Sequence, residues 1–279
     1  MSSLFDLRGR VAVVSGAAQG IGKETALALA EAGADLMLVD RNLPGAQATA
    51  AQIRALGRKA VDSSCNVSDP GAIAAMFRQL DAEFGRVDFL GNIAGDGHVA
   101  KPEELKIDDL LRALQNLVVG RFAMCQEAGR RMLAQGRGSI MNIGSIAATT
   151  ALGRGHIAYS MAMGAVVQMT RELSTEWSSR GVRVNAVLPA QVINPSLAAR
   201  IQKDSTLEGR FLNGIPAGRL GRPGDIRGLA VLLASDASEW LTGALIPMDG
   251  GNLAMNAGGT PGHQPAQLQP FRAEQERGN

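Results

Sequence analysis

The feature that most constrains the fold is a glycine-rich turn placed between a short apolar run and a helical pattern. Residues 11–15 (VAVVS) are apolar and rich in β-branched side chains, which favour a strand. The turn 16–22 (GAAQGIG) follows at once, and a helical pattern then runs through residues 23–32. A strand, a turn of this kind and a helix form half of a nucleotide-binding βαβ unit.

The glycines of the turn have separate physical roles. Gly16 permits the tight turn, Gly20 lets backbone amides approach a pyrophosphate, and Gly22 allows close packing of the helix. The amino end of the helix then faces the phosphates with its partial positive charge. A turn that is only structural is the alternative, but the strand and helix around it favour the binding function.

An acidic residue at the end of the next expected strand bears on the choice of cofactor. The run 34–39 (ADLMLV) leads to Asp40, 18 residues after Gly22, where a carboxylate accepts bonds from an adenosine ribose. A 2′-phosphate would meet like charge there, so Asp40 favours NAD over NADP. Arg41 follows at once and weakens that argument by offering a phosphate a partner. A solvated charge at a strand end is the alternative.

Apolar runs and helical patterns alternate along the rest of the chain. Asp69 and Pro70 are typical of a helix start, and Gly85 of a helix end. Residues 107–134 form one long helical pattern. Strands that alternate with helices predict a parallel sheet covered on both faces, in the doubly wound α/β form. The further strands are expected at residues 59–65, 87–90, 139–143, 182–188 and 243–247.

The chain reads as one domain followed by a tail. No repeat or linker interrupts residues 1–251, so we expect a single nucleotide-binding domain there. Within it, the polar segment 190–221 follows a strand's carboxyl end and is placed to act as a substrate lid. Residues 252–279 are rich in Gly, Pro, Gln and charge, which predicts a tail.

Composition excludes several classes of partner. The formal net charge is only +2 and aromatic residues make up 4% of the chain, so we expect no nucleic-acid partner. No run of 18 uncharged apolar residues is present, and the amino terminus lacks the apolar region of a signal peptide. We therefore expect no membrane partner and a cytoplasmic location. Cys65 and Cys125 lack metal-ligand spacing and are expected to be buried, reduced thiols, and no metal site is expected.

Two residues that carry chemistry stand beside the fifth expected strand. Ser145 follows the strand 139–143, and Tyr159 opens a helical pattern after a loop. A serine at a strand's carboxyl end and a tyrosine at a helix start can converge on one crevice of a parallel sheet. The sequence therefore predicts that Ser145 and Tyr159 lie on one crevice.

The pattern resembles the short-chain dehydrogenase/reductase family from about residue 4 to residue 251. The segments that carry the resemblance are SGAAQGIG (15–22), GNIAG (91–95), VRVNAVLPA (182–190), GRPGDI (221–226) and TGALIPMDGG (242–251). The resemblance implies a Rossmann-type fold with a seven-stranded parallel sheet, a homotetramer or homodimer, and an oxidoreductase that uses NAD(P). In that family a tyrosine exchanges a proton with the substrate oxygen, and a serine hydrogen-bonds the same oxygen.

The resemblance also assigns cofactor-binding positions. These are Gly16, Gln19, Gly20, Ile21, Gly22, Asp40, Arg41, Asn66, Val67, Asn92, Ala94, Gly95, Tyr159, Pro189, Val192 and Asn194. Asn66 stands where the family usually has Asp, and Asn194 where Thr is common. An asparagine can still hydrogen-bond a cofactor at both places, so we expect NAD binding to be kept.

Two departures from the family pattern fall beside the tyrosine. Met163 stands where the family has a lysine that lowers the tyrosine's pKa and holds the nicotinamide ribose. Leu117 stands where the family has an asparagine that supports this lysine. The two apolar replacements are compatible with each other, because a methionine has no charge that needs support. His156 or Arg154 is a candidate for a replacement charge, while Arg112 and Arg121 read as surface charges.

The leading hypothesis is an NAD(H)-dependent short-chain oxidoreductase acting on a carbonyl or secondary alcohol, with an altered Ser-Tyr site. One alternative is a catalytically impaired dinucleotide-binding protein that serves as a sensor or scaffold. Another is a non-redox enzyme that holds NAD as a structural group. We expect NADH to bind, and we expect changing Met163 to Lys together with Leu117 to Asn to raise turnover.

Overall fold

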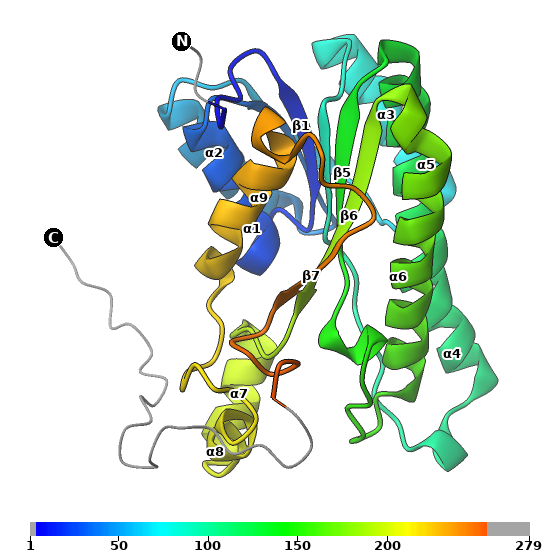
Figure 1. The fold of residues 1–279 in the computed structure, drawn as a ribbon, viewed down its shortest axis with the longest axis vertical. Helices are drawn as coiled ribbons and strands as arrows, with labels where there is room; N and C mark the ends of the chain where they lie inside the picture. Colours follow the sequence, from blue (N-terminus) through cyan, green and yellow to red (C-terminus); the bar gives the residue numbers. More distant parts are fainter. Residues whose placement is uncertain (1–3, 256–279) are drawn as a thin grey trace, which may run out of the picture.

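Parallel strands form one seven-stranded sheet in the computed structural model, which describes residues 4–255 (Figure 1). The order across the sheet is β3-β2-β1-β4-β5-β6-β7, and every neighbouring pair is parallel. The expected doubly wound Rossmann-type sheet is thereby confirmed. The strands are β1 (Val11–Ser15), β2 (Asp35–Asp40), β3 (Ala60–Ser64), β4 (Phe89–Asn92), β5 (Gly138–Ile143), β6 (Val182–Pro189) and β7 (Leu245–Met248).

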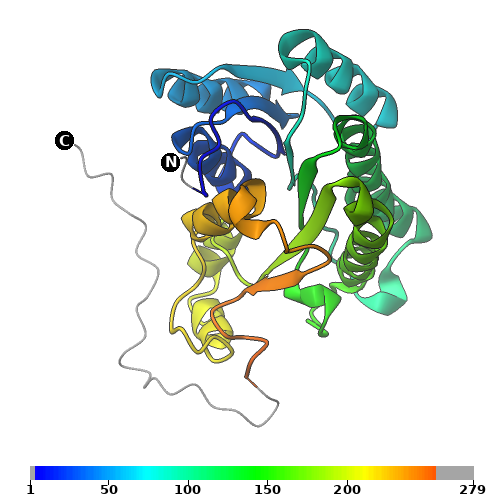
Figure 2. The same cartoon turned by 45° about the horizontal axis from the view of Figure 1, so that its top comes forward.

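Helices cover both faces of the sheet (Figures 1 and 2). One face is packed against α1 (Gly20–Glu31), α2 (Leu43–Ala55) and α9 (Arg227–Ala234). The opposite face is packed against α3 (Pro70–Phe84), α5 (Gly120–Gln135) and α6 (Ile157–Trp177). The smaller helices are α4 (Ile107–Leu114), α7 (Pro195–Lys203) and α8 (Leu207–Leu212). None of the helices within residues 4–255 is long and apolar enough to cross a bilayer.

The alternation of side chains along the interior strand β1 fills both cores. Ala12 and Val14 pack toward α1 and α9, whereas Val11 and Val13 pack toward α3 and α5. Successive strand residues point to opposite faces, so a strand buried on both faces must be apolar throughout. This explains why the runs read as uninterrupted apolar segments in the sequence.

The start and end of α3 show how local sequence sets a helix. The Asp69 Oδ1 accepts hydrogen bonds from the amides of Gly71 (2.8 Å) and Ala72 (3.2 Å). Pro70 occupies the first turn, where its missing N–H costs nothing. Gly85 ends the helix with a φ of 68°, a left-handed conformation that glycine adopts without strain.

The long helix expected over residues 107–134 is interrupted. A π-helical turn, Gln115–Val119, separates α4 from α5. The turn ends at Gly120, where an added Cβ would sit 1.8 Å from the Val67 carbonyl oxygen. The wide turn brings α5 against the backbone of the β3–α3 loop at this point, and it changes the helical phase of the residues that follow.

The segment 190–221, expected to be a lid, folds around a small core of its own. Helices α7 and α8 lie in it, and Figure 1 places them below the carboxyl ends of the strands. The side chains that form this core are Leu197, Leu207, Phe211, Leu212, Ile215 and Leu220. Whether the segment closes over a substrate stays a prediction, and the predicted tail falls almost entirely on residues 256–279, outside the described residues.

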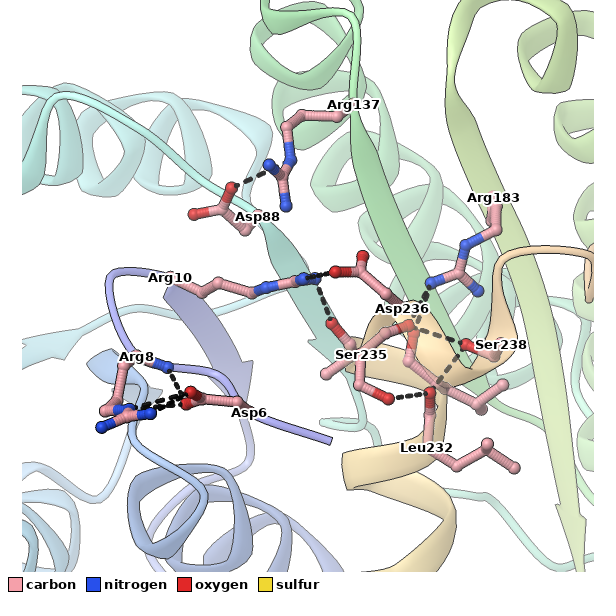
Figure 3. Close-up of polar contacts among 12 residues, drawn as sticks. Asp6, Arg8, Arg10, Asp88, Arg137, Arg183, Leu232, Ser235, Asp236 and Ser238 are labelled. Atoms are coloured by element: carbon pink, nitrogen blue, oxygen red, sulfur yellow. Dashed lines mark hydrogen bonds and ion pairs between the residues drawn. The ribbon is translucent and has the colours of Figure 1, made fainter. Parts of the chain in front are cut away.

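Polar contacts tie the strands together at their amino ends, opposite the glycine-rich turn (Figure 3). The Arg10 guanidinium pairs with Asp236 at 2.5 Å and donates to the Ala234 carbonyl at 3.0 Å, which joins β1 to the end of α9. The buried Asp88 carboxylate accepts from the Val11 amide at 2.9 Å and pairs with Arg86 at 2.6 Å. These contacts hold the start of β1 in the centre of the sheet.

We expect Asp88→Asn to lower the free energy of unfolding by about 1–3 kcal/mol, because it leaves buried donors without their charged acceptor. Urea denaturation monitored by circular dichroism measures the change. The matched control is Glu104→Gln, which breaks an exposed pair with Lys101 and should cost less than about 1 kcal/mol. Equal effects of the two changes would show that Asp88 has no special structural role.

Candidate active site

A cleft of about 860 Å³ opens at the carboxyl ends of the strands. This is the edge where ligands bind in open α/β sheets, and the volume lies within the usual range for ligand sites of roughly 300–1,000 Å³. Most of the residues predicted from the sequence line it. They are Gly16, Gln19, Gly20, Ile21, Gly22, Asp40, Arg41, Asn66, Val67, Ala94, Gly95, Ser145, Tyr159, Val192 and Asn194.

Two predicted cofactor residues do not line the cleft. The Asn92 amide is buried and donates to the Arg121 carbonyl and to Asn142 Oδ1, both at 3.0 Å. Asn92 therefore joins β4, β5 and α5 from behind the cleft wall. Pro189 is the last residue of β6 and is buried, so its contribution is to end the strand where the lid segment begins.

The glycine-rich turn fits the phosphates of a dinucleotide. Gly16 has a φ of 73°, and a Cβ there would lie 3.2 Å from the Ala94 amide nitrogen. At Gly22 a Cβ would lie 2.0 Å from the Gly16 carbonyl oxygen, so α1 begins in direct contact with the turn. Gly20 has a φ of 58°, and the space above it is open. The amino end of α1 therefore faces the cleft without side chains in the way, as a pyrophosphate requires.

Asp40 is held rigidly at the other side of this turn. Its Oδ2 accepts from the Ala18 amide at 3.0 Å, and its Oδ1 accepts from the Asn42 amide at 2.8 Å. Each oxygen keeps a second lone pair for a ribose hydroxyl. Arg41 forms an ion pair with Asp96 at 2.5 Å, and both residues line the cleft.

Ser145 lies two residues beyond β5 and is buried at the cleft wall. Its Oγ accepts from the Ala147 amide at 3.1 Å, which caps the short 3₁₀ turn Ile146–Ala148. A hydroxyl that accepts a bond still has its own hydrogen to give. The cap thus orients Ser145 and leaves its O–H available to an oxygen in the cleft.

Tyr159 stands in the first turn of α6, which begins at Ile157 rather than at the tyrosine itself. The expected convergence with Ser145 is found, because both side chains line the same cleft. The ring of Tyr159 packs against Gly97, where a Cβ would lie 3.0 Å from the ring. The His156 ring meets it edge-on, with 6.4 Å between the centroids.

The comparisons with known proteins agree with this arrangement. The family model described as Enoyl-(Acyl carrier protein) reductase matches residues 16–252. The D-threitol dehydrogenase of Mycolicibacterium smegmatis is 40% identical over 247 residues, 88% of this chain and 94% of the relative. This chain belongs to the short-chain dehydrogenase/reductase family. It is therefore an oxidoreductase of the short-chain type.

Two further relatives show how closely the family resembles this chain. The 2-dehydro-3-deoxy-D-gluconate 5-dehydrogenase of Pseudoalteromonas atlantica is 36% identical, over 90% of this chain and 98% of the relative. The crystal structure of a gluconate 5-dehydrogenase from Burkholderia cenocepacia in complex with NADP and tartrate superposes with a TM-score of 0.84. It is 30% identical and covers 90% of this chain and 98% of that one.

The residues at the lysine and asparagine positions expected for a short-chain dehydrogenase lie together in the structure. Met163 and Leu117 are both buried in one apolar cluster, and the partly buried Tyr159 packs against it. The cluster joins α6 to the π-helical turn directly behind the tyrosine. The sequence argument that the two apolar replacements suit each other is consistent with this packing, in which neither position has a charge to solvate.

One expectation about this short-chain dehydrogenase was wrong. Arg121 was expected on the surface, but only 4% of it is exposed. Its Nη1 donates to the Ile143 carbonyl oxygen, and its Nη2 donates to the Ile93 carbonyl oxygen at 3.2 Å. Arg121 follows Leu117 by one helical turn, so the spacing could have placed both on one face. The close approach at Gly120, which draws this part of α5 inward, has no signal in the sequence beyond the glycine itself.

Both cysteines are buried thiols, and one of them lines the cleft. Cys65 and Cys125 are free and buried, as expected. Burial raises the pKa of Cys65 to about 11 and that of Cys125 to about 12, so both thiols stay protonated at neutral pH. Sequence reasoning missed further residues that line the cleft. They include Cys65, Leu152, Gln191, Arg200 and Phe211.

We expect Asp40→Ser to change cofactor discrimination. Losing hydrogen bonds to a charged acceptor costs about 1.5–3 kcal/mol, so NADH affinity should fall by about tenfold or more relative to NADPH. Quenching of tryptophan fluorescence gives both dissociation constants. In the control Asp96→Asn, Arg41 loses its partner, and NADPH binding should improve while NADH binding stays constant. An unchanged ratio in Asp40→Ser would remove the basis for assigning NAD.

Proposed function

We propose that this short-chain dehydrogenase uses NAD(H) to interconvert a secondary alcohol and a carbonyl on a small polyhydroxylated substrate. The observation that carries the proposal is the placement of Ser145 and Tyr159 on the wall of one cleft whose other wall is the glycine-rich turn and Asp40. A dinucleotide held by the turn would reach from Asp40 toward the two hydroxyls. The named relatives act on sugar-like alcohols, which supports the substrate class.

Ser145 positions the reacting oxygen in this proposal. Its Oγ is fixed by the Ala147 amide, so its hydroxyl hydrogen can be donated to the substrate oxygen. The same bond serves both directions, because an alcohol, an alkoxide and a carbonyl oxygen all accept it. Ser145 needs no change of protonation.

Tyr159 exchanges the proton on that oxygen. In the oxidation direction the tyrosine accepts the hydroxyl proton, and in the reduction direction it returns a proton to the carbonyl oxygen. When bound, the nicotinamide ring supplies or accepts the hydride. Within residues 4–255 the Tyr159 hydroxyl has no hydrogen-bond partner, which leaves it free to bond a substrate oxygen in the cleft that the residue lines.

Positive charge at the substrate end of the cleft favours an acidic substrate. Arg154 and Arg200 both line this end, and no carboxylate of residues 4–255 forms an ion pair with either. Burial lowers the pKa of Arg154, and repulsion from Arg200 and Arg210 adds to the effect. Arg154 also has a φ of 58°, a conformation that costs energy outside glycine. We propose that the pair receives the carboxylate of a hydroxy acid.

The sensor and structural-NAD alternatives have less support, because both hydroxyls remain in the cleft and the close relatives are named dehydrogenases. The proposed homo-oligomer is supported by apolar side chains exposed on α4, α5 and α6. These are Ile107, Leu111, Phe122, Ile157 and Met161. A cytoplasmic location remains a prediction.

We expect Tyr159→Phe to lower kcat by about 10²–10⁴-fold, the usual loss for a positioned acid–base group. Ser145→Ala should also lower kcat, because the reacting oxygen loses its donor. Initial rates with NAD⁺ on a panel of sugar acids and polyols give the values. NADH affinity serves as the control and should be unchanged in Ser145→Ala. Retention of full activity in Tyr159→Phe would exclude the proposed mechanism.

A second expectation concerns the substrate. Arg154→Ala should raise KM for a hydroxy acid such as gluconate by about tenfold or more, since a hydrogen bond to a charged group contributes about 1.5–3 kcal/mol. KM for a neutral polyol such as threitol should hardly change. Arg171→Ala is a matched control on the exposed surface of α6. A wild-type enzyme that prefers the neutral polyol would show that the arginine pair does not bind substrate.

A further inference from the structure

We propose that Arg121 is a positioning residue that supplies the positive charge beside Tyr159, in place of the lysine that other family members carry on α6. The charge has moved from α6 to α5, and it favours the ionised form of the tyrosine. This inference rests on the proposed function, because it assigns Tyr159 the acid–base role.

The Arg121 guanidinium lies directly behind the cleft wall. Its two terminal nitrogens donate to the carbonyl oxygens of Ile143 and Ile93, at the carboxyl ends of β5 and β4. A Cβ on the cleft residue Gly95 would lie 3.3 Å from Arg121 Nη2 and 2.6 Å from Leu117 Cδ2. Only the backbone of this turn therefore separates the guanidinium from the space of the cleft.

This buried charge has no counterion. No carboxylate of residues 4–255 forms an ion pair with Arg121, and its buried Nε–H finds no acceptor there. An arginine stays protonated in proteins, and an ion buried without a partner costs several kcal/mol. Two carbonyl dipoles offset only part of that cost. A negative charge that forms during the reaction would complete the pairing.

Tyr159 is the group that can carry this negative charge. Burial lowers the pKa of the Arg121 guanidinium, and electrostatic interaction with Tyr159 and then with Cys125 acts in the opposite direction. Tyr159 also packs against the apolar cluster that holds Leu117, one turn before Arg121. The apolar surroundings strengthen the interaction, because few polar groups screen it.

The other charged and titratable groups near the pair come from α5, from the start of α6 and from the cleft loops. Asp96, between Gly95 and Gly97, lines the cleft and forms an ion pair with Arg41 at 2.5 Å. Cys125, on α5, has its pKa raised to about 12 by burial and stays neutral. His156 contacts the tyrosine ring from α6's amino end, with its Nδ1 donating to the Gly153 carbonyl at 2.9 Å. His98 and Arg154 line the same cleft from its loops. Of these groups, Arg121 is the one whose charge is both permanent and buried.

The proposed step leaves the overall reaction unchanged. In oxidation the phenolate of Tyr159 takes the proton of the substrate hydroxyl, the carbonyl double bond forms, and the C–H hydride goes to NAD⁺. In reduction each transfer runs backward. Arg121 exchanges no proton and forms no bond to the substrate. It acts by lowering the energy of the phenolate relative to the phenol.

This assignment also explains why two positions near Tyr159 are apolar, namely Met163 on α6 and Leu117 in the π-helical turn. With a cation already on α5, a lysine at Met163 would add a like charge in an apolar cluster, and an asparagine at Leu117 would have nothing to support. The earlier expectation changes accordingly. In the presence of Arg121, Met163→Lys with Leu117→Asn should raise turnover little or lower it. In Arg121→Gln the same two changes should restore activity.

The chain contains a single tyrosine, which makes the charge state of Tyr159 directly measurable. The near-ultraviolet absorbance of the phenolate is recorded during a pH titration of the folded protein, with Tyr159→Phe as the blank. Arg121→Gln should raise the midpoint of this transition by about one to three pH units, and Arg121→Lys should keep it near the wild-type value. The wild-type chain unfolded in urea provides a reference near pH 10 that needs no substitution.

Turnover measurements add a second readout. In the oxidation direction, kcat falls at low pH as the phenolate is protonated. In Arg121→Gln this fall should shift to higher pH by as much as the phenolate midpoint does, while KM for NAD⁺ stays constant. Arg121→Lys should keep the fall in place. A uniform loss of kcat at all pH values in both variants would mean that Arg121 only supports the strand ends, and would overturn the inference.

The two proposals fail in different ways. If the wild-type protein oxidises no alcohol on the panel yet shows the low phenolate midpoint, the proposed function fails and the electrostatic role of Arg121 stands. The opposite result is that the wild-type protein oxidises an alcohol, but the phenolate midpoint is the same in the wild type, in Arg121→Gln and in the urea-unfolded chain. The function then stands and the inference is overturned. Melting temperatures show that each variant is folded at the pH values used.

Discussion

The reversal of the strand order between β1 and β4, which are paired neighbours in the sheet, is the constraint on which the site depends. The chain leaves β1 for α1 on one face, and after β4 it crosses to α4 and α5 on the other face (Figure 1). The loops that follow the two strands must therefore diverge, and a crevice opens between them. The glycine-rich turn, Ser145 and Tyr159 are all found at this edge because each follows, or packs beside, a strand that ends there.

The cost of burying a charge limits which side chains can stand behind Tyr159 in the crevice. Most family members are expected to hold a lysine there with the help of an asparagine. In this chain those two positions are apolar and join one cluster, while the neighbouring helix brings an arginine to the strand ends. Two carbonyls hold the guanidinium in a fixed position. A rigid fork of this kind loses less conformational freedom on ordering than a lysine stem.

Much of the fold was accessible from the sequence, because local signals and the global pattern agreed. The Asp69–Pro70 start, the Gly85 end and the apolar runs each predicted their element to within a few residues. The glycine-rich turn and Asp40 were likewise found where expected. The π-helical turn was not predictable from local sequence, and it ends at the contact between Gly120 and Val67, which are distant in sequence. Arg121 was misjudged for the same reason, since its burial depends on that contact.

The contact at Gly120 also limits how this protein can vary. Any side chain there would meet the Val67 carbonyl, so even alanine would force α5 away from the β3–α3 loop. Val67 lines the cleft, and Arg121 follows Gly120 directly. Any substitution of Gly120 is therefore expected to disturb the structure. A substitution that moved α5 away from Val67 would move Arg121 with it. The single hydrogen atom that serves as the side chain of Gly120 thus sets how closely the first turn of α5 approaches the β3–α3 loop.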